Sequence, residues 1–228
     1  MKTEVIITAD GSNSLYIKEL DEGYHSVHGA IQESTHVFIN AGFKKVCSTV
    51  GETTCEINIL EIGLGTGLNV LLTLLDAKNS NKKINYTAIE PYPIDTDVAE
   101  HLNYVQLLSD EKLQMIFEKI HTCDWDLPIK FSENFTFCKI KNTVQQCVLA
   151  AKYDLIYFDA FAPRVQPELW TEEVFSKIYS ATKPDGVLVT YCAKGEVKRV
   201  LKRSGFEVES LQGPPGKREM IRAIKKSV

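Results

Sequence analysis

The sequence predicts an α/β fold with a mostly parallel, seven-stranded sheet. Apolar segments rich in Ile, Val, Tyr and Phe alternate with segments of helical character through most of the chain, which is the pattern of repeated strand–helix units. The last two apolar segments are joined without a helix, so the sheet should end in an antiparallel hairpin. With 228 residues, 44% of them hydrophobic, the chain can form one large domain or one domain with an appendage.

The expected strands and helices of the parallel part follow one another at short spacing. Each expected strand is a run of β-branched and aromatic residues, and these runs fall at residues 57–63, 84–90, 135–140, 153–160 and 186–192. Helices are expected at residues 67–78, 143–151, 171–182 and 195–204, and residues 95–119 are expected to form one helix or two. Strands joined by crossover helices pair in parallel and are covered by helices on both faces.

The C-terminal hairpin distinguishes between two kinds of α/β protein. FEVESL, residues 206–211, and EMIRAI, residues 219–224, are separated by a segment too short for a crossover helix. A parallel sheet closed by one antiparallel strand is typical of the Rossmann-like, class I S-adenosylmethionine-dependent methyltransferase fold. It is not typical of a nicotinamide-dependent dehydrogenase.

Residues 1–50 differ from this core, which we expect at residues 51–228. Residues 3–20 are predicted to form two strands around an Asp-Gly-Ser-Asn turn, and residues 28–42 a helix that ends at Gly42. We expect this small β/α appendage to pack on the core as a lid or flank of its binding pocket.

The formal net charge of −4 argues against general affinity for nucleic acid, but the charge is unevenly distributed. Residues 194–228 contain ten Lys or Arg and four Glu, a balance of +6, so residues 1–193 carry −10. Four cations occupy adjoining stripes of one expected helix: Lys198, Arg199, Lys202 and Arg203. This face is either an ordinary solvated surface or, together with Lys217 and Arg218, a phosphate-binding footprint.

Other features argue against membrane, secreted and metal-binding proteins. No apolar segment is long enough to span a membrane, and MKTEVIITAD lacks the apolar core of a signal peptide, so we expect a cytoplasmic protein. The six cysteines are scattered, without a C-x-x-C pair and without a histidine at ligand spacing. We therefore expect no metal site and no disulfide framework.

Three candidate binding positions follow the ends of three expected strands, where ligands bind in open α/β sheets. In EIGLGTGLN, residues 61–69, the backbone can pass close to a ligand because three residues lack side chains: Gly63, Gly65 and Gly67. Glu90 ends the next strand, where a carboxylate can accept hydrogen bonds from the ribose hydroxyls of an adenosine. Asp159 follows the apolar run LIYF.

Longer motifs carry a more specific resemblance. EIGLGTGLN, FDAFAPRVQPELWTEEVFSKI, KPDGVLVTYCAKG, GPPGKREM and YHSVHGAIQESTHVFI together resemble the methyltransferase domain of the MnmC-type enzymes that modify the tRNA wobble uridine, and the likeness covers nearly the whole chain. The bifunctional members have an additional FAD-dependent oxidoreductase domain. This chain has neither the length nor a second dinucleotide fingerprint for that domain, so we expect a stand-alone form without FAD.

The resemblance implies an activity and its partners. A methyl group would pass from S-adenosylmethionine, leaving S-adenosylhomocysteine, to the amine of 5-aminomethyl(-2-thio)uridine in the tRNA anticodon stem-loop. The product would be 5-methylaminomethyl(-2-thio)uridine. Asp159 is the catalytic candidate, since it could attract the substrate ammonium, orient the amine and help its proton leave. We rank positioning above base catalysis because a carboxylate of ordinary pKa is a weak base for this proton.

The resemblance also indicates the binding residues. Cofactor binding is expected from Gln32, Glu33, Glu61, Gly63, Leu64, Gly65, Thr66, Gly67, Asn69, Glu90, Asn142 and Asp159. Lys141-Asn142 stands where the family commonly has Gly-Asp, and Gln32 and Glu33 could equally be a surface pair on a helix. Substrate binding is expected from Phe161, Pro163, Lys198, Arg199, Lys202, Arg203, Lys217 and Arg218. Trp170 either stacks on a base or is buried at the start of a helix.

Two other functions remain open on the sequence. A spermidine-synthase-like aminopropyltransferase shares a small N-terminal β element, the glycine loop and a strand-end Asp, but it would need an acidic polyamine channel in place of the basic C-terminal segment. A non-catalytic RNA-binding module of the same fold gives no reason to combine Gly63, Gly65, Glu90 and Asp159 in one chain.

Overall fold

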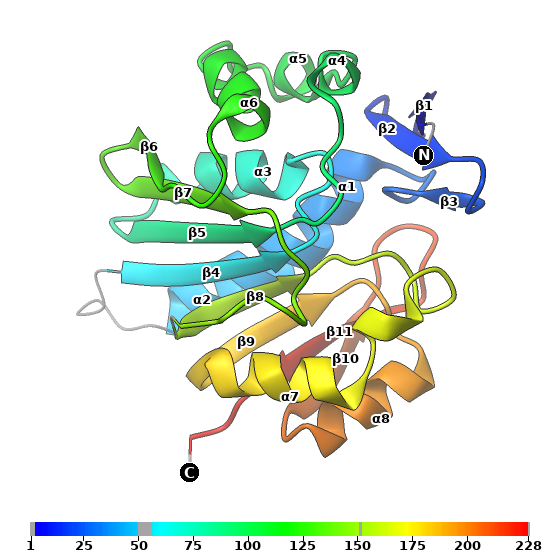
Figure 1. Cartoon of the computed structure of the whole chain (residues 1–228), viewed down its shortest axis with the longest axis vertical. Coiled ribbons are helices and arrows are strands. Elements are labelled where there is room, and N and C mark those ends of the chain that lie inside the picture. The colour runs from blue at the N-terminus through cyan, green and yellow to red at the C-terminus, as the bar shows by residue number, and fades with distance from the viewer. Residues whose placement is uncertain (1–2, 50–55, 151, 228) are drawn as a thin grey trace.

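The computed structural model describes residues 3–49, 56–150 and 152–227 and contains an eight-stranded sheet between layers of helices (Figure 1). The strand order is β10-β11-β9-β8-β4-β5-β7-β6. Five central strands are parallel, namely β7 (Phe135–Ile140), β5 (Lys83–Ile89), β4 (Glu56–Ile62), β8 (Tyr153–Phe158) and β9 (Thr182–Thr190). The predicted α/β fold with a mostly parallel sheet is confirmed.

Both edges of the sheet are antiparallel. β11 (Glu219–Ile224) pairs antiparallel with β9 and with β10 (Glu207–Gln212), which confirms the C-terminal hairpin. At the other edge, β6 (Ile129–Ser132) pairs antiparallel with β7 and adds an eighth strand to the seven expected. Its four residues, IKFS, are too short a run for the pattern to distinguish from a loop.

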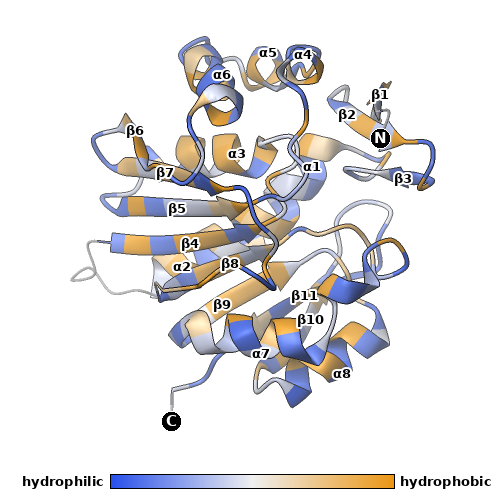
Figure 2. Cartoon of the chain, in the orientation of Figure 1, coloured by the Kyte–Doolittle hydropathy of each residue, from blue (hydrophilic) through white to orange (hydrophobic). Residues whose placement is uncertain are grey.

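Helices cover both faces of this sheet, which explains why β8 is apolar throughout. Leu155 and Tyr157 pack in one core with α3 and α6, whereas Ile156 and Phe158 pack in the other with α7 and α8. A strand buried on both faces needs no polar alternation. Figure 2 shows hydrophobic residues along the central strands. The helices named here are α3 (Leu68–Ala77), α6 (Leu113–Thr122), α7 (Glu172–Ala181) and α8 (Gly195–Arg203).

Two of the expected helices differ from the prediction. Residues 95–119 fall in three short helices: α4 (Thr96–Ala99), α5 (Tyr104–Leu108) and α6. Residues 143–150 contain turns and no helix, and residue 151 lies outside the described residues. Val144 and Cys147 in this segment are buried in the core although Val148 is 84% exposed, so turns bury part of its apolar surface without a helix. A short 3₁₀ helix, η2 (Pro167–Leu169), precedes α7.

The N-terminal segment forms a separate small sheet and then a long helical stretch. β1 (Thr3–Ile7) and β2 (Asn13–Ile17) pair antiparallel around the expected turn, and the short β3 (Glu22–Gly23) pairs with β2. The helical stretch runs through α1 (Ala30–Ser34), the π-helix η1 (Thr35–Phe43) and α2 (Lys44–Thr49). The expected domain boundary at residues 50–51 lies outside the described residues, so the division stays a prediction.

Gly42 does not end this helix, contrary to the expectation. A Cβ atom at Gly42 would lie 3.0 Å from Cγ2 of Val189 and 3.2 Å from Cε1 of Tyr157. Both contacts are on core strands, so the absent side chain lets η1 approach the sheet closely. The glycine serves helix–sheet packing here and not helix termination.

Candidate active site

A cavity of about 780 Å³ opens at the carboxyl ends of β4, β5 and β8. This volume is in the usual range for small-molecule pockets, about 300–1,000 Å³. The N-terminal sheet and the segment after it contribute Ile17, Tyr24 and His25 to one wall, as the appendage was expected to do. The remaining lining comes mainly from residues 62–66, 89–95, 143–146, 159–161 and 165–169.

The glycine loop between β4 and α3 requires glycine for two different reasons. Gly63 has a φ of +91°, and a Cβ there would lie 2.5 Å from the backbone oxygen of Asp159. Gly65 has a φ of +49° and lines the cavity, where a Cβ would lie 3.2 Å from the Tyr24 ring. The backbone therefore passes close to the cavity at Gly65, as the sequence predicted.

Glu90, which follows β5, is hydrogen-bonded to this loop. Its side chain is nearly buried, and it accepts hydrogen bonds from the backbone N–H groups of Gly65 (3.1 Å) and Tyr92 (2.8 Å). Burial raises the pKa of Glu90 above its usual value, although the backbone donors oppose this change. A carboxylate held by backbone amides at the rim of the glycine loop is suited to accept hydrogen bonds from ribose hydroxyls.

Asp159 faces the same cavity from the end of β8. The Nδ2 group of Asn69 donates to Oδ2 of Asp159 (2.8 Å) and to Oε1 of the fully buried Glu61 (2.9 Å). Burial, and then the negative charge of Glu33, raise the pKa of Asp159 to about 7. The ordinary pKa assumed for this carboxyl group from the sequence is therefore wrong, because the sequence did not show how far the group is removed from water.

Several predicted cofactor residues line the cavity and others do not. The lining includes Gly63, Leu64, Gly65, Thr66, Asn69, Glu90 and Asp159. Glu61 lies behind Asn69. Gly67 directly precedes α3, and a Cβ there would lie 2.9 Å from Cγ2 of Ile120. Gln32 faces a second, open groove beside residues 212–217. The side chain of Asn142 accepts a hydrogen bond from Thr143, and residues 143–146 line the cavity in its place.

Of the residues predicted to bind the substrate, some also line the cavity and others do not. Phe161 lines the cavity and meets the Tyr24 ring edge-on, with a centroid separation of 5.0 Å, whereas Pro163 is outside the lining. Trp170 is buried and donates from Nε1 to the Phe161 carbonyl (2.8 Å). The burial expected as one alternative for Trp170 is therefore correct, and its contact supports Phe161.

The cations of the basic segment differ in whether they form ion pairs within the protein. Lys198 is paired with Glu219 (2.5 Å) and Arg203 with Glu172 (2.7 Å). Arg199 and Lys202 are exposed on α8, and Arg218 is exposed in the β10–β11 loop. Lys217 is partly buried: its Nζ lies 2.5 Å from Glu33 and 3.9 Å from the centre of the Tyr191 ring.

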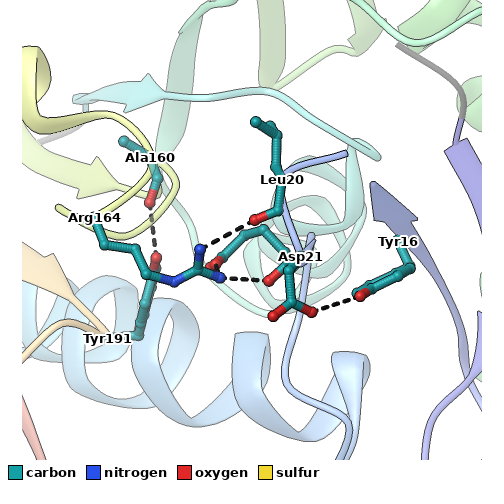
Figure 3. A network of polar contacts seen from close by, with 7 residues as sticks. Tyr16, Leu20, Asp21, Ala160, Arg164 and Tyr191 are labelled. Carbon is teal, nitrogen blue, oxygen red and sulfur yellow. Dashed lines mark hydrogen bonds and ion pairs between the residues drawn. The ribbon is translucent and has the colours of Figure 1, made fainter. Parts of the chain in front are cut away.

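Arg164 and Tyr191 were missed from the sequence, although both stand in the quoted motifs. Figure 3 shows Arg164 donating to the backbone oxygens of Leu20 and Asp21, and the same guanidinium pairs with Glu22 (2.6 Å). Tyr191 donates to the Ala160 oxygen (2.9 Å). Arg164 thus fastens the N-terminal sheet to the segment after Asp159, through contacts more than 140 residues apart in sequence that no local pattern reveals.

These residues fit S-adenosylmethionine. A left-handed glycine loop without room for side chains lies beside a nearly buried carboxylate, Glu90, and a second carboxylate, Asp159, reaches the same cavity. Among the described residues, no group of three or more His, Cys, Asp or Glu is placed to hold a metal ion. Within the same ranges, no helix has the length and hydrophobicity to cross a membrane. Fold and cavity together define a class I methyltransferase.

Comparison with known proteins identifies the family. Residues 105–226 match a family described as S-adenosyl-L-methionine-dependent methyltransferases, and the chain belongs to this family. The chain is 28% identical over 213 residues to the tRNA 5-methylaminomethyl-2-thiouridine biosynthesis bifunctional protein MnmC of Campylobacter hominis, covering 92% of this chain and 31% of that protein. It is 28% identical over 229 residues to the protein of the same name from Cupriavidus necator, covering 95% and 33%. The resemblance to MnmC-type proteins is confirmed.

Solved structures agree with the fold. The MnmC2 structure from Aquifex aeolicus has a TM-score of 0.76 at 24% identity, covering 100% of this chain and 71% of that one. Spermidine synthase from Thermotoga maritima has a TM-score of 0.54 at 16% identity, covering 100% and 75%. At these identities both show the fold alone. The chain spans about a third of the length of the curated relatives named above.

Proposed function

We propose that this protein methylates the amine of 5-aminomethyl(-2-thio)uridine at the wobble position of tRNA, with S-adenosylmethionine as methyl donor. The observation that carries the proposal is the position of Asp159, which faces the cavity beside the glycine loop and carries a raised pKa. Similarity to MnmC proteins over more than nine-tenths of the chain supports this substrate. The substrate also implies a cytoplasmic protein that binds the tRNA anticodon stem-loop.

The cofactor, when bound, supplies an electrophilic methyl group on a sulfonium. Glu90 would accept hydrogen bonds from ribose hydroxyls, and the backbone at Gly65 would pass along the ligand. Residues 143–146 line the cavity and could contact the base. These contacts require no movement of the sheet, because the groups that would make them already face the cavity.

The substrate amine must lose a proton before it can act as a nucleophile. An alkyl ammonium has a pKa of about 10, so an ordinary carboxylate would accept its proton at a cost of about 8 kcal/mol. The pKa of about 7 for Asp159 reduces this cost to about 4 kcal/mol. Asp159 would accept a hydrogen bond from the ammonium, orient the nitrogen and take up the proton. Base catalysis therefore contributes more than the sequence suggested.

The direct test is incubation of the protein with S-adenosylmethionine carrying a deuterated methyl group and with tRNA that contains 5-aminomethyluridine. We expect labelled 5-methylaminomethyluridine by nucleoside mass analysis, formed in equal amount to S-adenosylhomocysteine. Asp159→Asn is the matched control. Absence of label from the wobble nucleoside would contradict the proposal. An aminopropylated product from decarboxylated S-adenosylmethionine and putrescine would favour the aminopropyltransferase.

A further inference from the structure

A buried ion pair joins two segments that are far apart in the sequence. Lys217, in the loop between β10 and β11, lies 2.5 Å from Oε1 of Glu33 on α1. The other carboxylate oxygen of Glu33 accepts the backbone N–H of Ser26 at 2.7 Å. The Glu33 side chain is only 8% exposed and that of Lys217 31% exposed. A pair removed from water to this degree is costly to break, because either partner alone would leave an uncompensated charge.

The same pair is connected to the catalytic strand end. The Nζ atom of Lys217 lies over the Tyr191 ring at 3.9 Å, and Tyr191 donates to the backbone oxygen of Ala160 at 2.9 Å. Ala160 follows Asp159 directly. Lys217 thus contacts Tyr191, which is hydrogen-bonded to the residue after Asp159, while its amine points to Glu33. This geometry differs from that of an exposed lysine that binds a tRNA phosphate.

We propose that Glu33 and Lys217 form a positioning pair for Asp159, which fixes the cavity wall beside this residue and balances two opposite charges around its carboxylate. The two charges act on Asp159 in opposite directions. Glu33 raises the pKa of Asp159 and Lys217 lowers it. Glu33 has the larger effect of the two, so Lys217 compensates it in part; when one partner is neutralised, the charge of the other acts alone.

Other titratable groups around Asp159 contribute less charge. Those that share its surroundings are His25 after the N-terminal sheet, Glu61 on β4, Tyr86 on β5, Glu90 after β5 and Tyr191 after β9. Burial lowers the pKa of His25 to about 4 and raises the pKa of both tyrosines well above their usual values, so these three are neutral near pH 7. Burial also raises the pKa of Glu61, which favours its neutral form, and Glu61 is the same in all the variants below. Glu90 is common to all the variants below and cancels in their comparison.

The test is direct titration of the Asp159 carboxyl group by NMR with ¹³C-labelled aspartate, assigned with Asp159→Asn. Lys217→Met should raise the midpoint by about half a unit or more, and Glu33→Gln should lower it by at least as much. The double variant should titrate between the midpoints of the two single variants, and Lys217→Arg should keep the wild-type midpoint. Glu33→Gln keeps the shape of the side chain and an acceptor for Ser26, so it is the variant that least disturbs folding.

The chain provides a matched control in Lys183 and Asp154. This ion pair has nearly the same exposure, 33% and 10%, and a distance of 2.7 Å, but Asp154 lies near the opposite end of β8, about 16 Å along the strand from Asp159. Lys183→Met should leave the midpoint of Asp159 unchanged. Unchanged midpoints in both Lys217→Met and Glu33→Gln, or shifts of the same sign in the two, would overturn the proposal.

A second experiment measures the rate of methyl transfer and therefore rests on the proposed function. The acidic limb of the pH–rate profile for methyl transfer should move upward in Lys217→Met and downward in Glu33→Gln, as the titration does. If wild-type protein does not methylate tRNA, the proposed function fails while the titration still decides the role of the pair. Rate profiles that stay fixed while the titration moves would show that the pair does not act through Asp159 in catalysis, and would overturn its role in the reaction.

Discussion

Asp159→Asn should make the protein more stable while removing its activity. The pKa of the Asp159 carboxyl group is about 7 in the folded protein and 3.8 in an exposed chain. Below about pH 4 the group is protonated in both states and has no effect on stability. As pH rises from about 4 to about 7, the unfolded chain releases a proton that the folded protein retains, so the free energy of unfolding falls.

The size of the effect follows from this difference. Three pKa units correspond to at most about 4 kcal/mol of destabilisation above pH 7. Asparagine cannot ionise, yet its side-chain oxygen can still accept the hydrogen bond from Asn69. The variant should therefore gain up to about 4 kcal/mol over wild type at pH 8 and roughly 40% of that gain at pH 5.

Urea unfolding of both proteins at pH 5, 6, 7 and 8 measures this difference. The stability advantage of the variant should grow from pH 5 to about pH 7 and then level off. A constant difference between pH 5 and pH 8, or one that favours wild type more strongly at high pH, would refute the argument that burial raises the pKa of this group.

Two further predictions concern ligand binding. Gly65→Val should abolish S-adenosylmethionine binding in calorimetry, because the side chain enters the cavity; the left-handed backbone also costs about 1–2 kcal/mol. Gly11→Val is the control: it has a similar φ of +84° with no neighbour within 4 Å of its Cβ, so it should lose stability but keep binding. Alanine at Arg199 and Lys202 should flatten the log–log salt dependence of tRNA binding by about 0.7–0.9 for each lost phosphate contact, with donor affinity unchanged. An unchanged salt slope would mean that this face is ordinary solvated surface.

The fold could be predicted from the sequence because its signals are local. Strand composition, helix-length spacing and a hairpin loop without room for a helix are each confined to a short segment. The glycine loop, Glu90 and Asp159 could be placed together because strand ends in a parallel sheet share one edge. The helix expected at 143–151 did not form, although Val144 and Cys147 from this segment are buried in the core: they pack there from turns, which an apolar pattern does not distinguish from a helix.

The electrostatics of the site could not be predicted in the same way. Lys217 and Glu33 are 184 residues apart, and the sequence alone assigned them to different ligands. Glycine commonly follows the last turn of a helix, which suggested that the helix ends at Gly42. Its role is determined instead by the close approach to Val189 on β9. The raised pKa of Asp159 depends on its burial and on the charge of Glu33 in the N-terminal segment. Such properties arise from tertiary contacts, which residue patterns do not encode.

Single-turnover methylation of tRNA carrying 5-aminomethyluridine, by wild type and Asp159→Asn across a range of pH, tests the central claim most directly. At neutral pH the variant should be slower by about 10²–10⁴-fold, with donor affinity much less affected. Its rate should recover relative to wild type as pH approaches the pKa of the amine, about 10, because the amine then loses its proton without help. A variant with a near-normal rate at neutral pH would contradict the role of Asp159, and a severe defect that pH does not relieve would contradict its part in proton loss.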